Sequence, residues 1–237
     1  MKILSALTLL IVLATPALAR TLDDMRASGV LACGVVLERP GFSARDKNYQ
    51  WSGFDVDICR AIAAAVVGDP LKVNFVALAD DELVVALQSG EVDVLPRGPQ
   101  LSHSIDTSNG LIFVTPTFFE DASDGRVEVF GPFIRQGDTN WQQVVRWTIW
   151  SLIEAERLGI QSVGAASGLE NFLAVTKADS ALSLGLDAKW TAITIGAVGN
   201  YGEIFERHFG ATAATPKPRG PNKLWRDGGL FFAPSFN

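Results

Sequence analysis

The sequence predicts an α/β layered domain, because short apolar runs alternate with helix-like segments along its first half. Strands are expected at 31–37 (LACGVVL), 71–78 (LKVNFVAL) and 92–95, each of the kind that is buried on both faces of a sheet. Helices are expected within 53–68 and over 80–89. Short links between alternating strands and helices require parallel strands with right-handed crossovers.

The helix within 53–68 carries boundary signals at both ends. Asp55 and Asp57 lie in its first turn, where carboxylates complement the helix dipole, and Gly68 ends it. Its apolar stripe consists of Ile58, Cys59, Ile62 and Val66. We therefore interpret both aspartates as structural residues of this helix.

The second half predicts a strand at 130–135, a long helix that ends near Leu158, and a further helix over 187–207. Thr139, with Gln142 three residues later, has the pattern of a capping box at the start of the long helix.

The long helix is rich in tryptophan. One apolar stripe contains Trp141, Val145, Ile149 and Leu152. Trp147 and Trp150 lie off this stripe, which favours burial on a second side of the helix over an exposed docking patch.

Residues 1–19 have the features of a secretory signal peptide. Lys2 precedes an apolar run from Ile3 to Ala14, and the small residues Ala17 and Ala19 follow at the spacing that signal peptidase recognises. The run is shorter than the roughly 20 apolar residues that a membrane span needs. The mature chain is therefore expected to start at Arg20 and to be periplasmic, with no later membrane-spanning segment.

Composition and motifs exclude several classes of function. The formal net charge of −6 argues against nucleic acid or an anionic membrane as a partner, since both require a basic patch. The chain has no GxSxG, P-loop, HExxH or GxGxxG motif, and Ser102 and His103 are sequence neighbours without a third catalytic partner. His208 is expected to cap a helix or to lie in solvent. We expect neither an enzyme nor a cofactor.

The two cysteines, Cys33 and Cys59, would lie in an oxidising compartment after export, so a disulfide is plausible. A metal site is not expected, because the pair has neither CxxC spacing nor neighbouring histidines.

Six segments carry a resemblance to a known family. They are GFDVDICRAIAAAVVGDP (53–70), ALQSGEVDVL (86–95), GPFIRQGD (131–138), the tryptophan-rich helix after it, VGNYGEIFERHFG (198–210) and RGPNKLWRDGGLFFAP (219–234). In this order they resemble the periplasmic general L-amino-acid-binding proteins of ABC transporters, a branch of the polar amino-acid solute-binding family. Cys33 and Cys59 also match positions at which this branch carries cysteines.

The resemblance implies the type II periplasmic binding fold, in which two α/β lobes are joined by two crossover strands and hold the amino acid between them. Here FVTPTFFED (113–121) and VEVFGPFIRQGD (127–138) resemble the two crossovers, and only about 122–126 separates them. The implied architecture is one three-layer parallel-sheet lobe, built from 20–113 and 131–237. The second lobe is reduced to a short connector within 114–130.

The resemblance also implies a place for the ligand carboxylate, which favours a guanidinium and hydroxyl donors. Members of the family carry a pattern like G-x-T-x-T-x-x-R, and RGPQLSHSI (97–105) stands in its place. Gly98 is retained, Gln100 and Ser102 replace the threonines, and Ile105 replaces the arginine anchor. Arg97 could reach the same region, although a solvated or salt-bridged arginine is the alternative. The implied ligand contacts are therefore Arg97, Gly98, Gln100 and Ser102.

Two functional hypotheses remain open at this point. The first is a solute-binding component of an amino-acid importer, with an amino acid and an inner-membrane ABC permease as partners. The second is a single-lobe remnant or interaction module that folds and docks a partner without holding an amino acid. Loss of the second lobe would expose the cleft face near Pro99, Leu101, Phe118 and Phe119, and we expect a homodimer to cover it.

Overall fold

The computed structural model describes residues 21–108, 110–162 and 178–236. The predicted signal peptide lies outside these ranges. None of the helices within them is long and apolar enough to cross a membrane.

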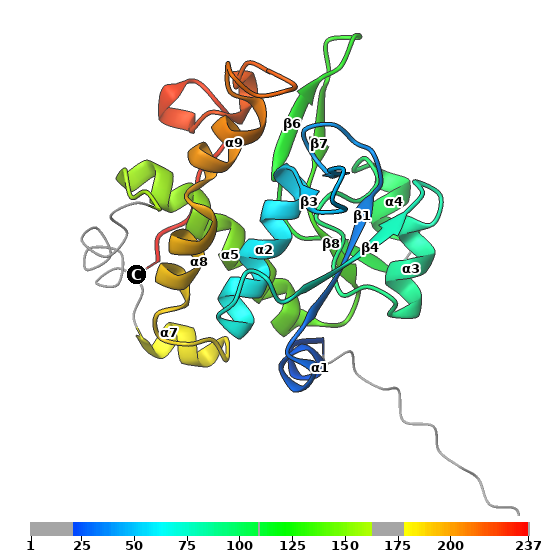
Figure 1. Ribbon diagram of the computed structural model, residues 1–237, viewed down its shortest axis with the longest axis vertical. Helices are drawn as coiled ribbons and strands as arrows, with labels where there is room; N and C mark the ends of the chain where they lie inside the picture. Colours follow the sequence, from blue (N-terminus) through cyan, green and yellow to red (C-terminus); the bar gives the residue numbers. More distant parts are fainter. Residues whose placement is uncertain (1–20, 109, 163–177, 237) are drawn as a thin grey trace, which may run out of the picture.

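The centre of the fold is a mixed sheet (Figure 1). β1 (Leu31–Val36) pairs in parallel with β4 (Val73–Leu78), and β5 (Leu111–Phe113) pairs antiparallel with β8 (Phe133–Arg135). Two single bridges connect these pairs: Val94 lies beside β1 in parallel, and Leu95 lies beside β8 in the antiparallel sense. The strand expected over 92–95 is thus reduced to two bridges. The parallel pairing expected among 31–37, 71–78 and 92–95 is confirmed, and the antiparallel β5–β8 pair adds a direction that a parallel-sheet lobe does not include.

Helices cover both faces of the sheet, so the α/β layering is confirmed (Figure 1). One large apolar cluster lies between the sheet and helices α2, α5, α8 and α9, and a smaller one includes residues of α3. The bounds are α1 Thr21–Ser28, α2 Phe54–Val67, α3 Leu83–Ser89, α4 His103–Ser108, α5 Thr139–Leu158, α7 Ala178–Ser183, α8 Trp190–Val198 and α9 Tyr201–Phe209. Shorter elements are β2 Ala44–Arg45, β3 Trp51–Ser52, η1 Gly220–Asn222 and η2 Trp225–Asp227.

Helix α2 lies against β1 and is bonded to it covalently. A disulfide joins Cys33 of β1 to Cys59 of α2, and both cysteines are fully buried. At the end of the helix Gly68 adopts φ 77°, which a glycine tolerates without steric cost, and its N–H donates to Ala64. The helix, its end and the disulfide agree with the sequence.

Helix α5 begins differently from the expectation. Asp138, not Thr139, is the N-cap residue: its carboxylate accepts hydrogen bonds from the N–H groups of Trp141 at 3.0 Å and of Thr21 at 2.9 Å. A carboxylate satisfies two amide donors at once and adds its charge to the helix dipole, so it outcompetes the neighbouring hydroxyl.

The single helix expected over 187–207 is two helices, α8 and α9. Gly199, at φ 86°, ends α8, and Asn200 begins α9 with a capping box in which its side chain and that of Glu203 exchange hydrogen bonds with backbone N–H groups. A new helix start leaves backbone N–H groups without intrahelical partners, and the capping box satisfies two of them.

The off-stripe tryptophans of α5 are covered from a second side. Trp147 packs edge-on against Trp150, with 4.9 Å between ring centroids, and against Phe236 near the C-terminus at 4.8 Å. Both tryptophans are half-buried and pack against the large apolar cluster, in agreement with a second packed side of α5.

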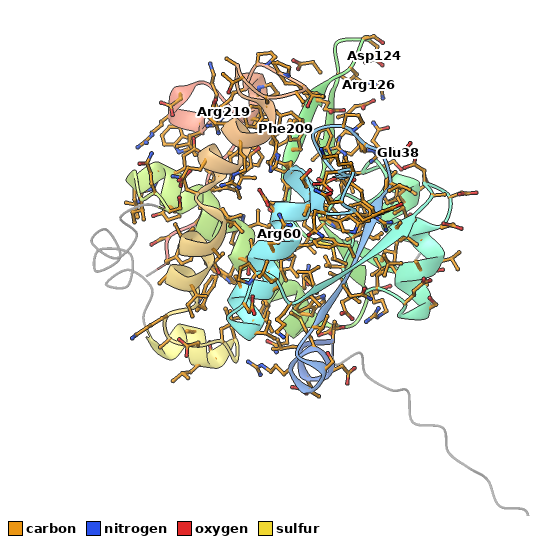
Figure 2. All side chains as sticks on the ribbon, viewed as in Figure 1. Glu38, Arg60, Asp124, Arg126, Phe209 and Arg219 are labelled. Carbon is orange, nitrogen blue, oxygen red and sulfur yellow. A yellow bond between two sulfur atoms is a disulfide. The ribbon has the colours of Figure 1, made fainter. Side chains whose placement is uncertain are left out.

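Residues of the two expected crossovers pair with each other as a β-hairpin that projects from the body (Figures 1 and 2). β6 (Phe118–Asp121) pairs antiparallel with β7 (Val127–Phe130), and the turn at 122–126 closes through a hydrogen bond from Ala122 N–H to the Arg126 carbonyl. Figure 2 labels Asp124 and Arg126 at its outer end.

The base of the hairpin is fixed by residues from the C-terminal part of the chain. Asn222 donates from Nδ2 to the Phe119 carbonyl at 2.9 Å and accepts from the Phe119 N–H at 2.7 Å. Phe118 and Phe119 are buried, at 2% and 8% exposure. The expectation that these two phenylalanines lie on an exposed cleft face is therefore wrong. Pro99 and Leu101, the other residues of that face, are half-buried, and the homodimer stays a prediction.

Candidate functional site

Arg97 is a buried arginine at the base of the hairpin. It follows the bridge residues Val94 and Leu95, and only 5% of it is exposed. The guanidinium carbon lies 4.1 Å from the ring centroid of Phe42 and 3.8 Å from that of Phe130, which belongs to β7. Cation–π contacts of this kind hold a guanidinium in a desolvated position.

The charges around Arg97 satisfy it only in part. Its Nη2 lies 3.4 Å from Oε1 of Glu120 on β6, and its buried Nη1 has no hydrogen-bond partner. Burial lowers the pKa of Arg97, against the opposing effect of the Asp55 and Glu120 carboxylates. Arg97 is thus buried and paired with Glu120 rather than solvated, and its role as a ligand contact stays a prediction.

Asp55 is the second buried charge in this region. It is 3% exposed, its Oδ1 has no hydrogen-bond partner, and burial raises its pKa to about 6, against the stabilising charge of Arg97. Its position in the first turn of α2 is as expected, but a helix-dipole role alone does not account for a carboxylate so completely removed from water.

Asp57 differs from Asp55 although it lies only two residues away. It accepts from His208 Nε2 at 2.7 Å and from Arg207 Nη1 at 2.5 Å, while Arg60 Nη1 lies at 3.1 Å. Burial alone would raise its pKa, but these partners hold it below its ordinary value. Asp57 therefore joins α2 to α9, and the expectation that His208 caps a helix or lies in solvent is wrong.

We use the name Arg97 cluster for Arg97, Asp55, Glu120 and Lys217, together with the rings of Phe42 and Phe130. Lys217 belongs to the cluster because its Nζ lies 3.0 Å from Oε1 of Glu120. No motif or periodicity in the sequence singles out Glu120, Lys217, Phe42 or Phe130. An acidic residue within the apolar crossover TPTFFED and a lysine between two prolines were the available signals.

The other predicted ligand contacts do not share one surface with Arg97. Gly98 is packed: a Cβ built on it would lie 2.3 Å from the ring of buried Phe133. Gln100 and Ser102 are exposed. Ser102 Oγ accepts from the Ile105 N–H at 3.3 Å at the start of α4, and Ile105 packs against the smaller apolar cluster.

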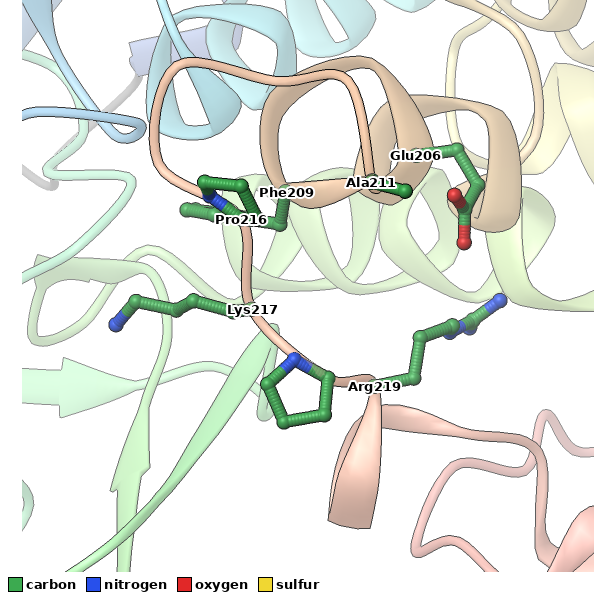
Figure 3. A pocket seen from close by; sticks show the side chains of 8 residues that line it. Glu206, Phe209, Ala211, Pro216, Lys217 and Arg219 are labelled. Atoms are coloured by element: carbon green, nitrogen blue, oxygen red, sulfur yellow. The ribbon is translucent and has the colours of Figure 1, made fainter.

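A hollow of about 380 Å³ lies beside the Arg97 cluster (Figure 3). Phe209, Pro216, Lys217, Arg219 and Glu206 contribute to its lining. Figure 3 shows Lys217 and Arg219 extending in opposite directions from the segment that carries both. Arg219 pairs with Glu156 at 2.7 Å, whereas Lys217 pairs with Glu120, so the two cations serve different parts of the fold.

The electrostatics of Asp55 lead to a test by pH. Because its pKa is higher in the folded state than the ordinary 3.8, it favours folding at low pH, and this contribution is lost as the pH rises through about 6. Relative to Asp55→Asn, the native chain should gain roughly 1.4 kcal/mol of unfolding free energy between pH 7.5 and pH 5. Urea unfolding of both proteins at the two pH values measures this, and parallel pH profiles would contradict it.

The sequence matches a known family over most of its length. A profile described as "Bacterial extracellular solute-binding proteins, family 3" matches residues 31–211. The chain belongs to this family. Its members are solute-binding proteins and not enzymes, in keeping with the lack of catalytic motifs in the sequence.

Two relatives in this family carry names that describe amino-acid-binding proteins. The general L-amino acid-binding periplasmic protein AapJ of Rhizobium johnstonii is 31% identical, with 98% of each chain covered. The glutamate/glutamine/aspartate/asparagine-binding protein BztA of Rhodobacter capsulatus is 30% identical, with 92% of this chain and 94% of its own length covered. The chain is thus related to the binding components of amino-acid ABC transporters.

A solved structure of the family agrees with the fold. It is an ABC transporter/periplasmic binding protein from Brucella ovis with glutathione bound, 30% identical, with a TM-score of 0.85 over 92% of this chain and 100% of its own. The alignment with the Rhizobium protein extends over 335 positions, whereas this chain has 237 residues. The alignment positions beyond the length of this chain are therefore gaps in this chain, filled only by residues of the Rhizobium protein.

Proposed function

We propose that this protein is the periplasmic solute-binding component of an amino-acid ABC importer, with an amino acid or a small amino-acid derivative as its solute and a membrane permease as its partner. Family membership and the names of the relatives support the transporter role. The predicted signal peptide at 1–19 supports the periplasmic location.

One observation carries the assignment of the binding residue: the buried Nη1 of Arg97 has no hydrogen-bond partner. A buried donor without a partner costs the full desolvation penalty, so such groups in folded proteins call for an explanation. A ligand carboxylate can accept from both Nη atoms of a guanidinium in a bidentate pair. Arg97 would then serve as the carboxylate anchor, since Ile105 occupies the family's arginine position and packs into the smaller apolar cluster.

We further propose that residues 20–113 and 131–237 form one lobe of a type II periplasmic binding fold, and that 114–130 is what remains of the second lobe. The β6–β7 hairpin supports this division, because its two strands lie within the expected crossovers and only the turn at 122–126 separates them. The alignment with the Rhizobium protein, which is longer than this chain, supports the loss of a large segment but does not give its place.

The alternative is a lobe that docks a partner without holding an amino acid. Two observations favour it: Ile105 replaces a charged anchor with an apolar side chain, and Arg97 is almost fully covered by its own chain.

Isothermal titration separates the two functions. The chain from Arg20 onward would be titrated with the twenty standard amino acids and with glutathione, the compound bound in the Brucella structure. We expect micromolar binding to at least one of them, and its loss in Arg97→Met. Arg126→Met, which removes an exposed guanidinium at the hairpin tip, is the matched control and should bind as the native chain does. No heat of binding across the whole panel would overturn the importer function and favour the docking lobe.

A further inference from the structure

We propose that Glu120 is a built-in carboxylate that occupies Arg97 while the lobe is empty, so that a solute carboxylate must displace it. This inference rests on the proposed role of Arg97 as the anchor for a solute carboxylate. It assigns to the residual hairpin a function of its own, namely control of access to that anchor.

The position of Glu120 fits a displaceable occupant. Its Oε1 lies between two cations, 3.4 Å from Arg97 Nη2 and 3.0 Å from Lys217 Nζ. Its side chain is 30% exposed, whereas that of Arg97 is 5% exposed. The carboxylate is therefore the partner that solvent can reach, and it can leave while the arginine stays in its aromatic surroundings.

The contact between Glu120 and Arg97 is also weaker than the guanidinium allows. A bidentate carboxylate forms two parallel N–H···O bonds of about 2.7–2.9 Å with an arginine. Glu120 reaches Arg97 through one oxygen at 3.4 Å and leaves Nη1 without a partner. A free carboxylate that contacts both Nη atoms would gain hydrogen bonds that Glu120 does not make, and would thus compete with it.

Charge repulsion within the hairpin favours keeping Glu120 beside its cations until another anion replaces it. Glu120 and Glu128 stand directly opposite each other in the β6–β7 register. Like charges at directly opposed positions destabilise a strand pair, and the cations Arg97 and Lys217 offset this repulsion. When a solute takes Arg97, the hairpin loses one of these two cations and should loosen.

Acetate is the probe, because it offers a carboxylate and nothing else that a binding site could recognise. Acetate binding to the native chain and to Glu120→Gln would be followed by the NMR signal of the Arg97 Nε–H group, assigned by its absence in Arg97→Met. We expect Glu120→Gln to bind acetate at least ten-fold more tightly than the native chain. Asp124→Asn, which removes the same charge at the exposed tip of the same hairpin, should stay within two-fold of the native affinity.

The fold of each variant would be verified by circular dichroism. If Glu120→Gln does not fold, Glu120→Asp keeps the charge but shortens the reach toward Arg97, and an intermediate gain in affinity is expected. An affinity for acetate that is the same with and without the Glu120 carboxylate would overturn the inference, even if the native chain binds an amino acid. Tight acetate binding only in Glu120→Gln, with no solute bound by the native chain, would support the inference and overturn the importer function instead. No acetate binding by any variant would overturn the role of Arg97 as a carboxylate anchor and, with it, the role of Glu120 as its displaceable occupant.

Discussion

Reduction of the Cys33–Cys59 disulfide is expected to lower the free energy of unfolding by about 3.5 kcal/mol, the chain-entropy value for a cross-link between residues that are 26 positions apart. The bond constrains the unfolded chain, so its loss is felt mainly as a gain of unfolded-state entropy. Urea unfolding of the oxidised and the reduced native protein measures the difference directly, because both have the same side-chain atoms in the core apart from the bond itself.

A double variant, Cys33→Ala/Cys59→Ala, provides the control for reduction. Because both sulfurs are fully buried between β1 and α2, this variant should be less stable than the reduced protein by the additional cost of two small cavities. Equal stability of the oxidised and reduced proteins would show that the cross-link contributes nothing.

Replacement of Arg97 by methionine is expected to cost about 3 kcal/mol of unfolding free energy at pH 7.5, because removal of one partner leaves the other buried charges uncompensated. Asp55 bears most of the consequence, since its carboxylate is 3% exposed and Arg97 is the largest favourable charge acting on it. The pKa of Asp55 should rise further above about 6 in this variant. Urea unfolding measures the stability, and its pH dependence measures the shift.

A double-mutant cycle tests whether the cost arises from Asp55. In an Asp55→Asn background the same Arg97→Met substitution should cost clearly less, because no buried carboxylate is then left without its counter-charge. Equal costs in both backgrounds would show that Arg97 acts through its packing on Phe42 and Phe130 and not through Asp55.

The elements that the sequence predicts well are those governed by local signals. Helix α2 has acidic residues in its first turn, an apolar stripe and a terminal glycine, and the structure places all three as expected. The α8–α9 break also had a local signal in the sequence, because Asn200 and Glu203 have capping-box spacing. The start of α5 was wrong by one residue, because the carboxylate of Asp138 also serves the amide of Thr21, a contact between distant parts of the chain.

The candidate site could be predicted only in part, for a related reason. A matched motif pointed to Arg97 and its neighbours. Gly98, however, is fixed by packing against Phe133, and Ser102 bonds to the backbone at the start of α4. Gln100 is exposed. The partners of Arg97 come from segments far apart in sequence, among them Glu120 and Lys217. Their meeting depends on how the hairpin folds back onto the body, and no periodicity or spacing in the chain encodes that.

The hydrogen bonds of Asn222 to the backbone of Phe119 have a consequence for the order of folding. The two residues are 103 positions apart, so this clasp closes one of the longest loops in the molecule. Loop-closure entropy must be overcome before such a contact stabilises anything, which delays it relative to local pairing. Helix α2 and the β1–β4 pair, whose residues lie closer together in the sequence, can therefore form early. The β6–β7 hairpin can also pair locally, but the clasp of Asn222 on Phe119 has to wait for nearly the last residues of the chain.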